Sequence, residues 1–213
     1  MLSSGGFNTE YMKKVLIPII PLVLLISCIS TDTEINLEEN GSGRINLSYT
    51  VSTLVSTFGS LEEDPLLPLP VEEEDFRNTV NRSEGLSLNS YSRKEDEDTV
   101  QIEVSLNFDS IEDLNQLYGA GEQAVGISQE NGMQVFSQVI FVPPREGIDP
   151  KTQGFAENFF NDYELTFEIS PPETIESVSL GDIIEDGRTA AYTISITELL
   201  RAEEPIIWEV RWK

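Results

Sequence analysis

The sequence predicts an α+β fold with a mainly antiparallel sheet, hairpins and two or three short helices. Several segments alternate apolar and polar residues with a period of two, as strands do when one face of their sheet is wet. Two of these segments flank Asn40-Gly41-Ser42-Gly43, whose residue types accept positive φ and favour a hairpin turn. The helical segments are short, whereas a parallel sheet needs long crossover helices. These observations favour hairpins over βαβ units.

The strands follow from the alternation in chain order. Ile35 and Leu37 begin the first predicted strand. The second strand, after the turn, places apolar residues on one face and Asn, Ser and Thr on the other. The longest alternation runs from Val100 to Phe108. Further strands are predicted at 133–142, 163–169, 175–179, 189–197 and 206–213, the third and fourth of these being separated by a turn at 185–187.

The helices are predicted from caps and from spacing of three or four residues. Ser110 and Asp113 resemble a capping box, and Ile111, Leu114 and Leu117 follow at helical spacing. Two more short helices are predicted at 71–81 and 155–161. Three prolines at 61–70 and four glycines at 119–132 predict irregular loops.

The closing strand places Trp208 and Trp212 on one face. Large aromatic residues at strand spacing usually pack in a core, which is the first interpretation. The second is an apolar ligand pocket to which Phe108 and Phe167 also contribute from their strands. The sequence leaves both open.

Composition limits the function. The 213 residues include 13 basic and 38 acidic residues, which give a formal charge of −25. Such a surface is repelled by nucleic acid phosphates, so no nucleic acid partner is expected. There is no histidine and only one cysteine, which removes Ser-His-Asp, Cys-His and histidine-metal chemistry. We expect a protein that is not an enzyme and needs no metal or cofactor. A glycosidase-type carboxylate pair stays open.

Two acidic runs, at 72–75 and 95–98, offer oxygen atoms to calcium. Neither run has the spaced ligands and the glycine of an EF-hand loop. Charge runs are usually solvated surface, and this is the interpretation we prefer, with calcium as the alternative.

Residues 12–28 (MKKVLIPIIPLVLLISC) have the layout of a bacterial lipoprotein signal peptide. Lys13 and Lys14 precede an apolar run of about 12 residues, too short to span a bilayer and interrupted by two prolines. Leu25-Ile26-Ser27-Cys28 matches a lipobox, which predicts cleavage between Ser27 and Cys28 and acylation of Cys28 by diacylglycerol and a further chain such as palmitate.

This pattern divides the chain into three parts. Residues 1–27 are the predicted signal peptide, with translation starting at Met1 or at Met12. Residues 28–34 are the lipidated cysteine and a short tether, and 35–213 form a single α+β envelope domain. Removing the signal peptide removes Lys13, Lys14 and Glu10, so the mature chain is one unit more negative.

Two longer segments resemble one known family. INLEENGSGRINLSYTVS, at 35–52, and the segment at 163–212, which ends in WEVRW, are similar to bacterial lipoproteins with the LppM-like domain. The resemblance implies a membrane-tethered α+β domain, and binding of envelope lipids has been suggested for this family. It brings no catalytic residues.

Two functions are expected from these observations. The first is a membrane-anchored envelope lipoprotein, not an enzyme, that binds an apolar or lipid ligand or a partner near the membrane. The second is a structural or assembly factor whose acidic surface docks a basic envelope protein. Ile29 is not the aspartate that retains lipoproteins on an inner membrane. The expected location is the outer membrane in an organism with two membranes, and otherwise the outer face of the cell membrane.

Overall fold

The computed structural model describes residues 28–52, 70–81, 83–118, 123–145, 147–148, 151, 153–154, 163–184 and 187–213. Three predicted segments lie outside these residues: the predicted signal peptide at 1–27, most of the predicted proline-rich loop at 61–70, and the predicted helix at 155–161. None of the helices in the described part is both long and apolar enough to cross a bilayer.

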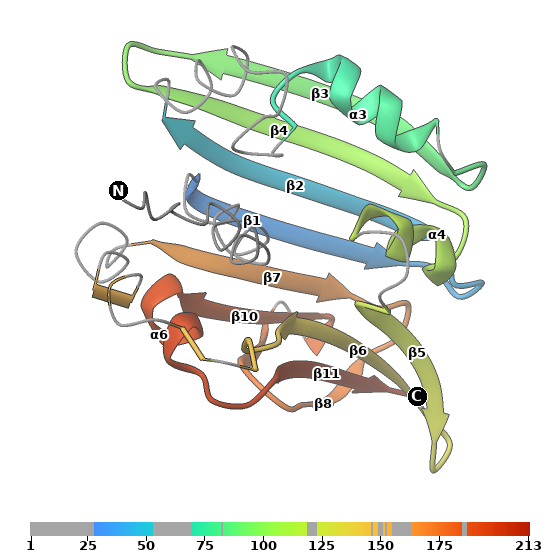
Figure 1. The fold of residues 1–213 in the computed structure, drawn as a ribbon. Coiled ribbons are helices and arrows are strands. Elements are labelled where there is room, and N and C mark those ends of the chain that lie inside the picture. The colour runs from blue at the N-terminus through green and yellow to red at the C-terminus, as the bar shows by residue number, and fades with distance from the viewer. Residues whose placement is uncertain are drawn as a thin grey trace, which may run out of the picture.

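Two sheets form the fold, and the prediction of a mainly antiparallel α+β protein is confirmed (Figure 1). The larger sheet has seven strands in the order β3-β4-β2-β1-β7-β10-β9, and the smaller has four in the order β5-β6-β11-β8. Only the β1–β7 pair is parallel among the described strand pairs. The strands of the larger sheet are β1 (Cys28–Leu37), β2 (Gly43–Ser52), β3 (Leu86–Glu95), β4 (Thr99–Phe108), β7 (Glu164–Ser170), β9 (Asp182–Ile184) and β10 (Thr189–Ser195). Those of the smaller sheet are β5 (Val125–Glu130), β6 (Met133–Phe141), β8 (Ile175–Val178) and β11 (Ile206–Trp212).

Helix α3 (Glu73–Val80) and helix α4 (Ile111–Leu117) lie where the sequence predicts them. Asp75 accepts the backbone N–H of Glu72 at 3.1 Å, and Ser110 accepts that of Asp113 at 3.2 Å, so each helix start has a capped donor. Leu114, in the middle of α4, is fully buried. Helix α3 packs against β3 of the larger sheet, and helix α4 contacts both β4 of the larger sheet and β5 of the smaller one.

The structure corrects the predicted start of the first strand. β1 begins at Cys28, and the segment 28–34, predicted to be a tether, pairs with β2 and in part with β7. This part of β1 is mostly polar, and its partners lie on both sides of it. Residues 28–34 form a strand because β2 and β7 pair with them, and they lack the alternating apolar residues from which the strand was predicted.

Four of the described elements were not predicted. β5 lies within the glycine-containing segment 119–132, which was predicted to be a loop, and a short helix, α6 (Ile196–Arg201), ends the predicted strand at 189–197. β9 has only three residues. β3 contains a register shift between Leu88 and Ser90 that interrupts its alternation, so Tyr91 faces the same side as Leu88.

The core lies between the two sheets and beneath the helices. Trp208 is completely buried there, and its indole Nε1 donates a hydrogen bond to the Leu180 carbonyl oxygen at 3.0 Å. Its ring meets Phe136 edge to face, with centroids 6.5 Å apart, and lies 6.4 Å from Tyr192. The indole of β11 therefore packs against a residue of each sheet, Phe136 of the smaller and Tyr192 of the larger, and its N–H has a hydrogen-bond acceptor.

One buried polar group weakens this core. Gln138 is 2% exposed, and its Oε1 has no hydrogen-bond partner among the described residues. Replacing Gln138 with Met keeps the length of the side chain and removes the unsatisfied oxygen. We expect the free energy of unfolding, measured in urea, to rise by about 1 kcal/mol, the lower end of the usual cost of a buried unpaired group, because the substitution also removes the amide nitrogen, which is not among the unpaired atoms.

Gln134→Met is the matched control for this variant, because Gln134 is on the same strand and is only partly buried. It should change stability by less than about 0.5 kcal/mol. Loss of stability in Gln138→Met would mean that the amide has a partner in solution.

Candidate functional site

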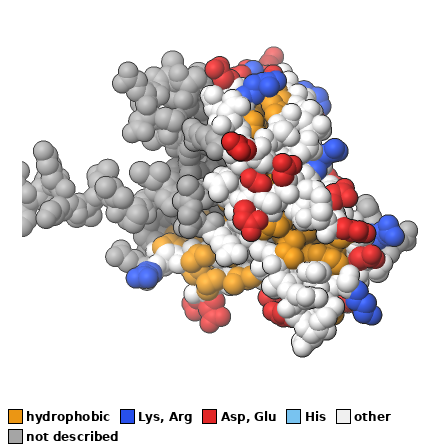
Figure 2. Space-filling view, turned by 90° about the vertical axis from the view of Figure 1, so that its right-hand side faces the viewer, with side chains coloured by type: hydrophobic (Ala, Val, Ile, Leu, Met, Phe, Trp, Pro, Cys, Tyr) orange, Lys and Arg blue, Asp and Glu red, His pale blue; other side chains and the backbone are white. Residues whose placement is uncertain are grey.

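A groove of about 750 Å³ lies at the end of the molecule where β1 turns into β2. The β1–β2 turn, the start of α4, β5 and the end of β11 all contribute to its walls. Figure 2 views this end and shows hydrophobic side chains surrounded by Asp and Glu. We call it the end groove. It is lined by Leu37, Glu38, Glu39, Asn40, Gly41, Ser110, Ile111, Glu112, Asn115, Gln116, Gln123, Gly126, Ile127, Gln134, Pro172 and Trp212.

The floor of the end groove is apolar. Trp212 and Leu37 are 4% and 5% exposed, so only small parts of these side chains reach the surface, while Ile111 and Ile127 are half-buried. These residues belong to the larger core cluster or pack against it. The floor is therefore a rigid continuation of the core, on which an apolar group can be covered without rearrangement.

The rim of the end groove is acidic. Glu38 and Glu39 lie in the β1–β2 turn, where Gly41 has a φ of 82° that favours glycine. Glu112 lies in the first turn of α4. All three glutamates are exposed, none forms an ion pair within the described part of the chain, and the described lining contains no Lys or Arg. The rim therefore offers negative charge without local compensation.

Asn115 fixes β5 beside α4. Its Nδ2 donates to the Val125 carbonyl oxygen at 2.8 Å, and its Oδ1 accepts from the Val125 N–H at 2.9 Å. The amide thus bonds both backbone groups of Val125, as a neighbouring strand would. This pair of bonds holds one wall of the end groove at a fixed distance from the helix.

The four predicted aromatic site residues lie in different environments. Phe108 and Trp208 are 1% and 0% exposed and belong to the core, and neither lines the end groove. Phe167 is partly buried and packs against both clusters of apolar residues. Of the four, only Trp212 lines the end groove. The core interpretation of Trp208 is thus the one that its burial supports.

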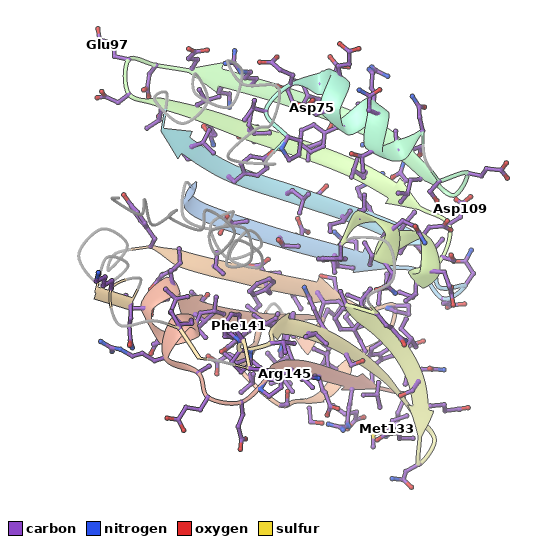
Figure 3. All side chains as sticks on the ribbon, in the orientation of Figure 1. Asp75, Glu97, Asp109, Met133, Phe141 and Arg145 are labelled. Carbon is purple, nitrogen blue, oxygen red and sulfur yellow. The ribbon has the colours of Figure 1, made fainter. Side chains whose placement is uncertain are left out.

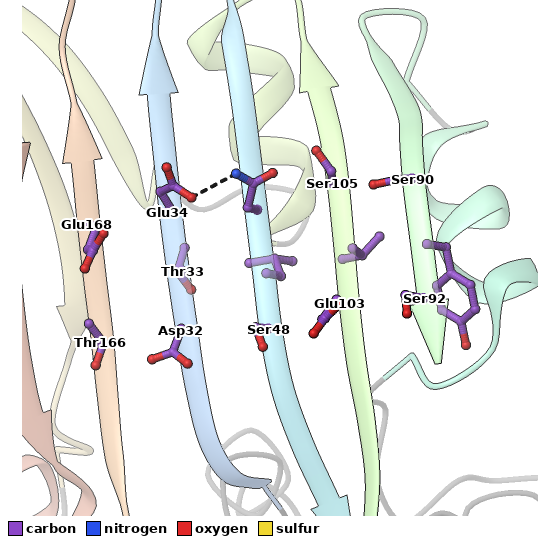
Figure 4. Close-up of a pocket in the computed structure, with 14 residues that line it drawn as sticks. Asp32, Thr33, Glu34, Ser48, Ser90, Ser92, Glu103, Ser105, Thr166 and Glu168 are labelled. Carbon is purple, nitrogen blue, oxygen red and sulfur yellow. Dashed lines mark hydrogen bonds between the residues drawn. The ribbon is translucent and has the colours of Figure 1, made fainter. Parts of the chain in front are cut away.

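A second, smaller groove of about 430 Å³ follows the wet face of the larger sheet. Figure 4 shows its carboxylates on neighbouring strands, among them Asp32, Glu34, Glu103 and Glu168. Glu34 accepts hydrogen bonds from Asn36 and Asn46, each at 2.9 Å, and Glu103 accepts one from Lys94 at 3.4 Å. These two carboxylates already have local partners, unlike the rim of the end groove.

The two acidic runs are used by the fold itself. Asp96, in the β3–β4 turn, accepts the backbone N–H of Asp98 at 2.9 Å and of Thr99 at 2.7 Å. These two hydrogen bonds, followed by one from the Thr99 hydroxyl, lower the pKa of the Asp96 carboxyl. Asp75 caps α3. Among the described residues, no group of three acidic, cysteine or histidine side chains is arranged to hold a metal ion.

The predicted lipidation residue lies at the opposite end of the larger sheet. Cys28 is the first residue of β1, whereas Leu37 at the other end of that strand lines the end groove. A strand rises by about 3.3 Å per residue, so about 30 Å separate them. Figure 3 shows the same two ends, with Glu97 in the β3–β4 turn at one and Asp109 at the other. An anchor on Cys28 leaves the end groove far from the bilayer.

Most of the end groove was not predicted from the sequence. Asn115, Glu112 and Ile127 come from segments that are separated in the chain from Leu37 and Trp212. The capping box at Ser110 was visible, and so was the turn at 40–43. No local sequence pattern indicated that α4, β5 and this turn lie together at one end of the molecule.

Comparisons with known proteins bear on the fold. No protein-family model matches the sequence, and no curated protein matches it either. In structure the chain resembles a solved domain. The NMR structure of the folded domain of LppM from Mycobacterium tuberculosis superimposes with a TM-score of 0.50 over 88% of this chain and 91% of that one, at 8% sequence identity. The likeness is one of fold, and in this respect it agrees with the resemblance found in the sequence.

Proposed function

We propose that this protein is a membrane-tethered envelope lipoprotein, not an enzyme, that binds its ligand or partner in the end groove. The lipobox at 25–28 and the LppM-like fold support the first part of this proposal. The second part is carried by one observation, the apolar floor around Trp212 beneath three exposed glutamates that form no ion pair with any described residue. Such a floor can bind an apolar group, and the rim selects against anionic ones.

Location follows from the proposed anchor. Acylation of Cys28 holds the domain at the outer membrane of an organism with two membranes, or at the outer face of a single membrane. The acidic surface is repelled by anionic headgroups, so the acyl chains supply the attachment. Since β1 starts at Cys28, the end groove points away from that bilayer. A soluble ligand or a protein opposite the membrane reaches it most easily.

Two tryptophans allow a direct test of the groove. The intact chain, labelled with 5-fluorotryptophan and held in phosphatidylcholine nanodiscs, should give two ¹⁹F signals, one from Trp208 and one from Trp212. Trp212→Phe assigns them by removing one signal. We expect a host envelope extract, separated into lipid and protein fractions, to shift the Trp212 signal and leave that of Trp208 unchanged.

The buried Trp208 signal serves as the internal control for a general change in folding. If neither fraction moves the Trp212 signal, the end groove is not the binding surface. A shift caused by the lipid fraction assigns the groove to an apolar ligand. A shift caused by the protein fraction assigns it to a docking partner.

A further inference from the structure

The wall of the end groove formed by β5 is an edge strand. β5 pairs with β6 along Val125–Glu130 and is the last strand of the smaller sheet. No described segment of the chain pairs with its other side. An edge strand presents a row of backbone N–H and C=O groups to any extended chain that approaches it.

Asn115 shows which backbone groups of β5 face outward. It bonds the N–H and C=O of Val125 from the side opposite β6. Alternate residues of a strand direct these groups to the same side. Ile127 and Gln129 therefore present their N–H and C=O groups to the open edge. Ser128, Gln129 and Glu130 are exposed, so this part of the edge is accessible.

The open edge is continuous with the end groove. Gly126 and Ile127 line the groove, as does Glu112 on α4, the helix that carries Asn115. If a chain pairs with β5 from Ile127 onward, the side chains on one of its two faces lie over the apolar floor of the end groove. The Asn115 amide stops the pairing at Val125, which fixes the register of such a chain. Its basic side chains can reach the exposed carboxylates of the rim.

We propose that the end groove binds an extended, cationic segment of a partner protein, which adds to β5 as a further strand. Backbone hydrogen bonds to Ile127 and Gln129 supply affinity, and alternate side chains supply specificity. One apolar side chain covers the floor near Trp212, while Lys or Arg residues face Glu38, Glu39 and Glu112. This inference rests on the proposed function and names the partner class for the same groove.

The test uses a defined peptide with the intact chain in phosphatidylcholine nanodiscs. The probe is a ten-residue peptide of alternating Lys and Val, capped at both ends, and its control carries Glu in place of every Lys. We expect the Lys peptide to shift the ¹⁹F signal of Trp212 and to slow hydrogen exchange at the Ile127 and Gln129 amides at least about tenfold. The Glu peptide should do neither.

Two kinds of variant separate the backbone from the charge contribution. Gln129→Pro removes an N–H that points to the open edge, a position that tolerates proline, and Gln129→Ala keeps it. We expect the Lys peptide to bind the alanine variant normally and the proline variant at least about tenfold more weakly. Replacing Glu38, Glu39 and Glu112 together by Gln should weaken binding about tenfold at low salt, from three exposed charge pairs. The glutamines lie on the surface and leave the fold intact.

The outcomes distinguish this inference from the function on which it rests. If an envelope fraction shifts Trp212 but the Lys peptide does not, the groove binds something else and the inference is overturned. Equal binding of the Lys and Glu peptides overturns the charge argument. Binding without protection at Ile127 and Gln129 overturns strand addition. If no probe and no envelope fraction shifts Trp212, the proposed function fails as well.

Discussion

Replacing Cys28 with alanine is expected to move the protein from the membrane fraction to the soluble fraction. Each buried CH₂ of an acyl chain contributes about 0.8 kcal/mol, and stable attachment needs at least two membrane signals, such as two chains. The formal charge of −25 offers no electrostatic attachment to replace them. Fractionation of cells, followed by mass spectrometry of the mature N-terminus, measures the change.

Lys13→Gln combined with Lys14→Gln makes a useful comparison, because it alters the predicted signal without touching the acylated atom. Those molecules of this variant in which the bond between Ser27 and Cys28 is cleaved should still carry lipid on Cys28. If the alanine variant at position 28 stays in the membrane fraction at the level of the unchanged protein, the lipobox interpretation is wrong. The apolar segment that precedes it would then be an anchor in its own right.

Replacing Trp208 with alanine is expected to lower the free energy of unfolding by about 3–5 kcal/mol, the usual range for a large buried aromatic residue. The indole is completely buried and meets Phe136 and Tyr192. Its loss also leaves the Leu180 carbonyl oxygen without the Nε1–H donor. Urea unfolding, monitored by far-ultraviolet circular dichroism, gives the midpoint and slope from which this change is calculated.

Ile207→Ala is the matched control, since Ile207 is the next residue on β11 and points the other way with 46% of its surface exposed. It should change stability by less than about 0.5 kcal/mol. A cost below about 1 kcal/mol for Trp208→Ala would contradict the filled core and would return this residue to the ligand-pocket interpretation.

The predicted anchor residue, Cys28, and the end groove lie at opposite ends of β1, and this arrangement bears on the proposed function. A ligand pocket lined by Phe108 and Trp208 would need space in the core, where both residues are buried. A groove about 30 Å from Cys28 suits a molecule that approaches from beyond the membrane surface. The second expected function, docking of a basic protein, therefore fits the end groove better than extraction of a lipid from the protein's own bilayer.

The regular alternation and the caps were sufficient to predict much of the fold. β4 follows the alternation from Val100 to Phe108, and the residues that alternate inward are buried. The same holds for Trp208, Val210 and Trp212 on β11. The start of α4 follows from Ser110, whose side chain accepts a backbone hydrogen bond. Each of these elements is predictable because a short segment contains both the spacing of its apolar residues and the residues that begin or end it.

The elements that the sequence did not predict are those whose partners decide their conformation. β3 loses its alternation at a register shift, and β5 contains Gly126 and three exposed residues, so neither has a regular apolar face. The polar first half of β1 forms a strand because β2 and, over part of it, β7 pair with it on both sides. Pairing between distant segments supplies what local propensity lacks.

The sequence by itself determined the α+β class, the first hairpin, two of the helices and the face shared by the two tryptophans. The lipobox at Cys28 stays a prediction. The tertiary structure alone decided that Trp208 fills the core while Trp212 reaches a groove, and that Asn115 holds β5 beside α4. Periodicity reports which face of an element is apolar. Periodicity does not report which distant elements pack together. The end groove exists because the β1–β2 turn, α4, β5 and β11, which are distant in sequence, pack together at one end of the molecule.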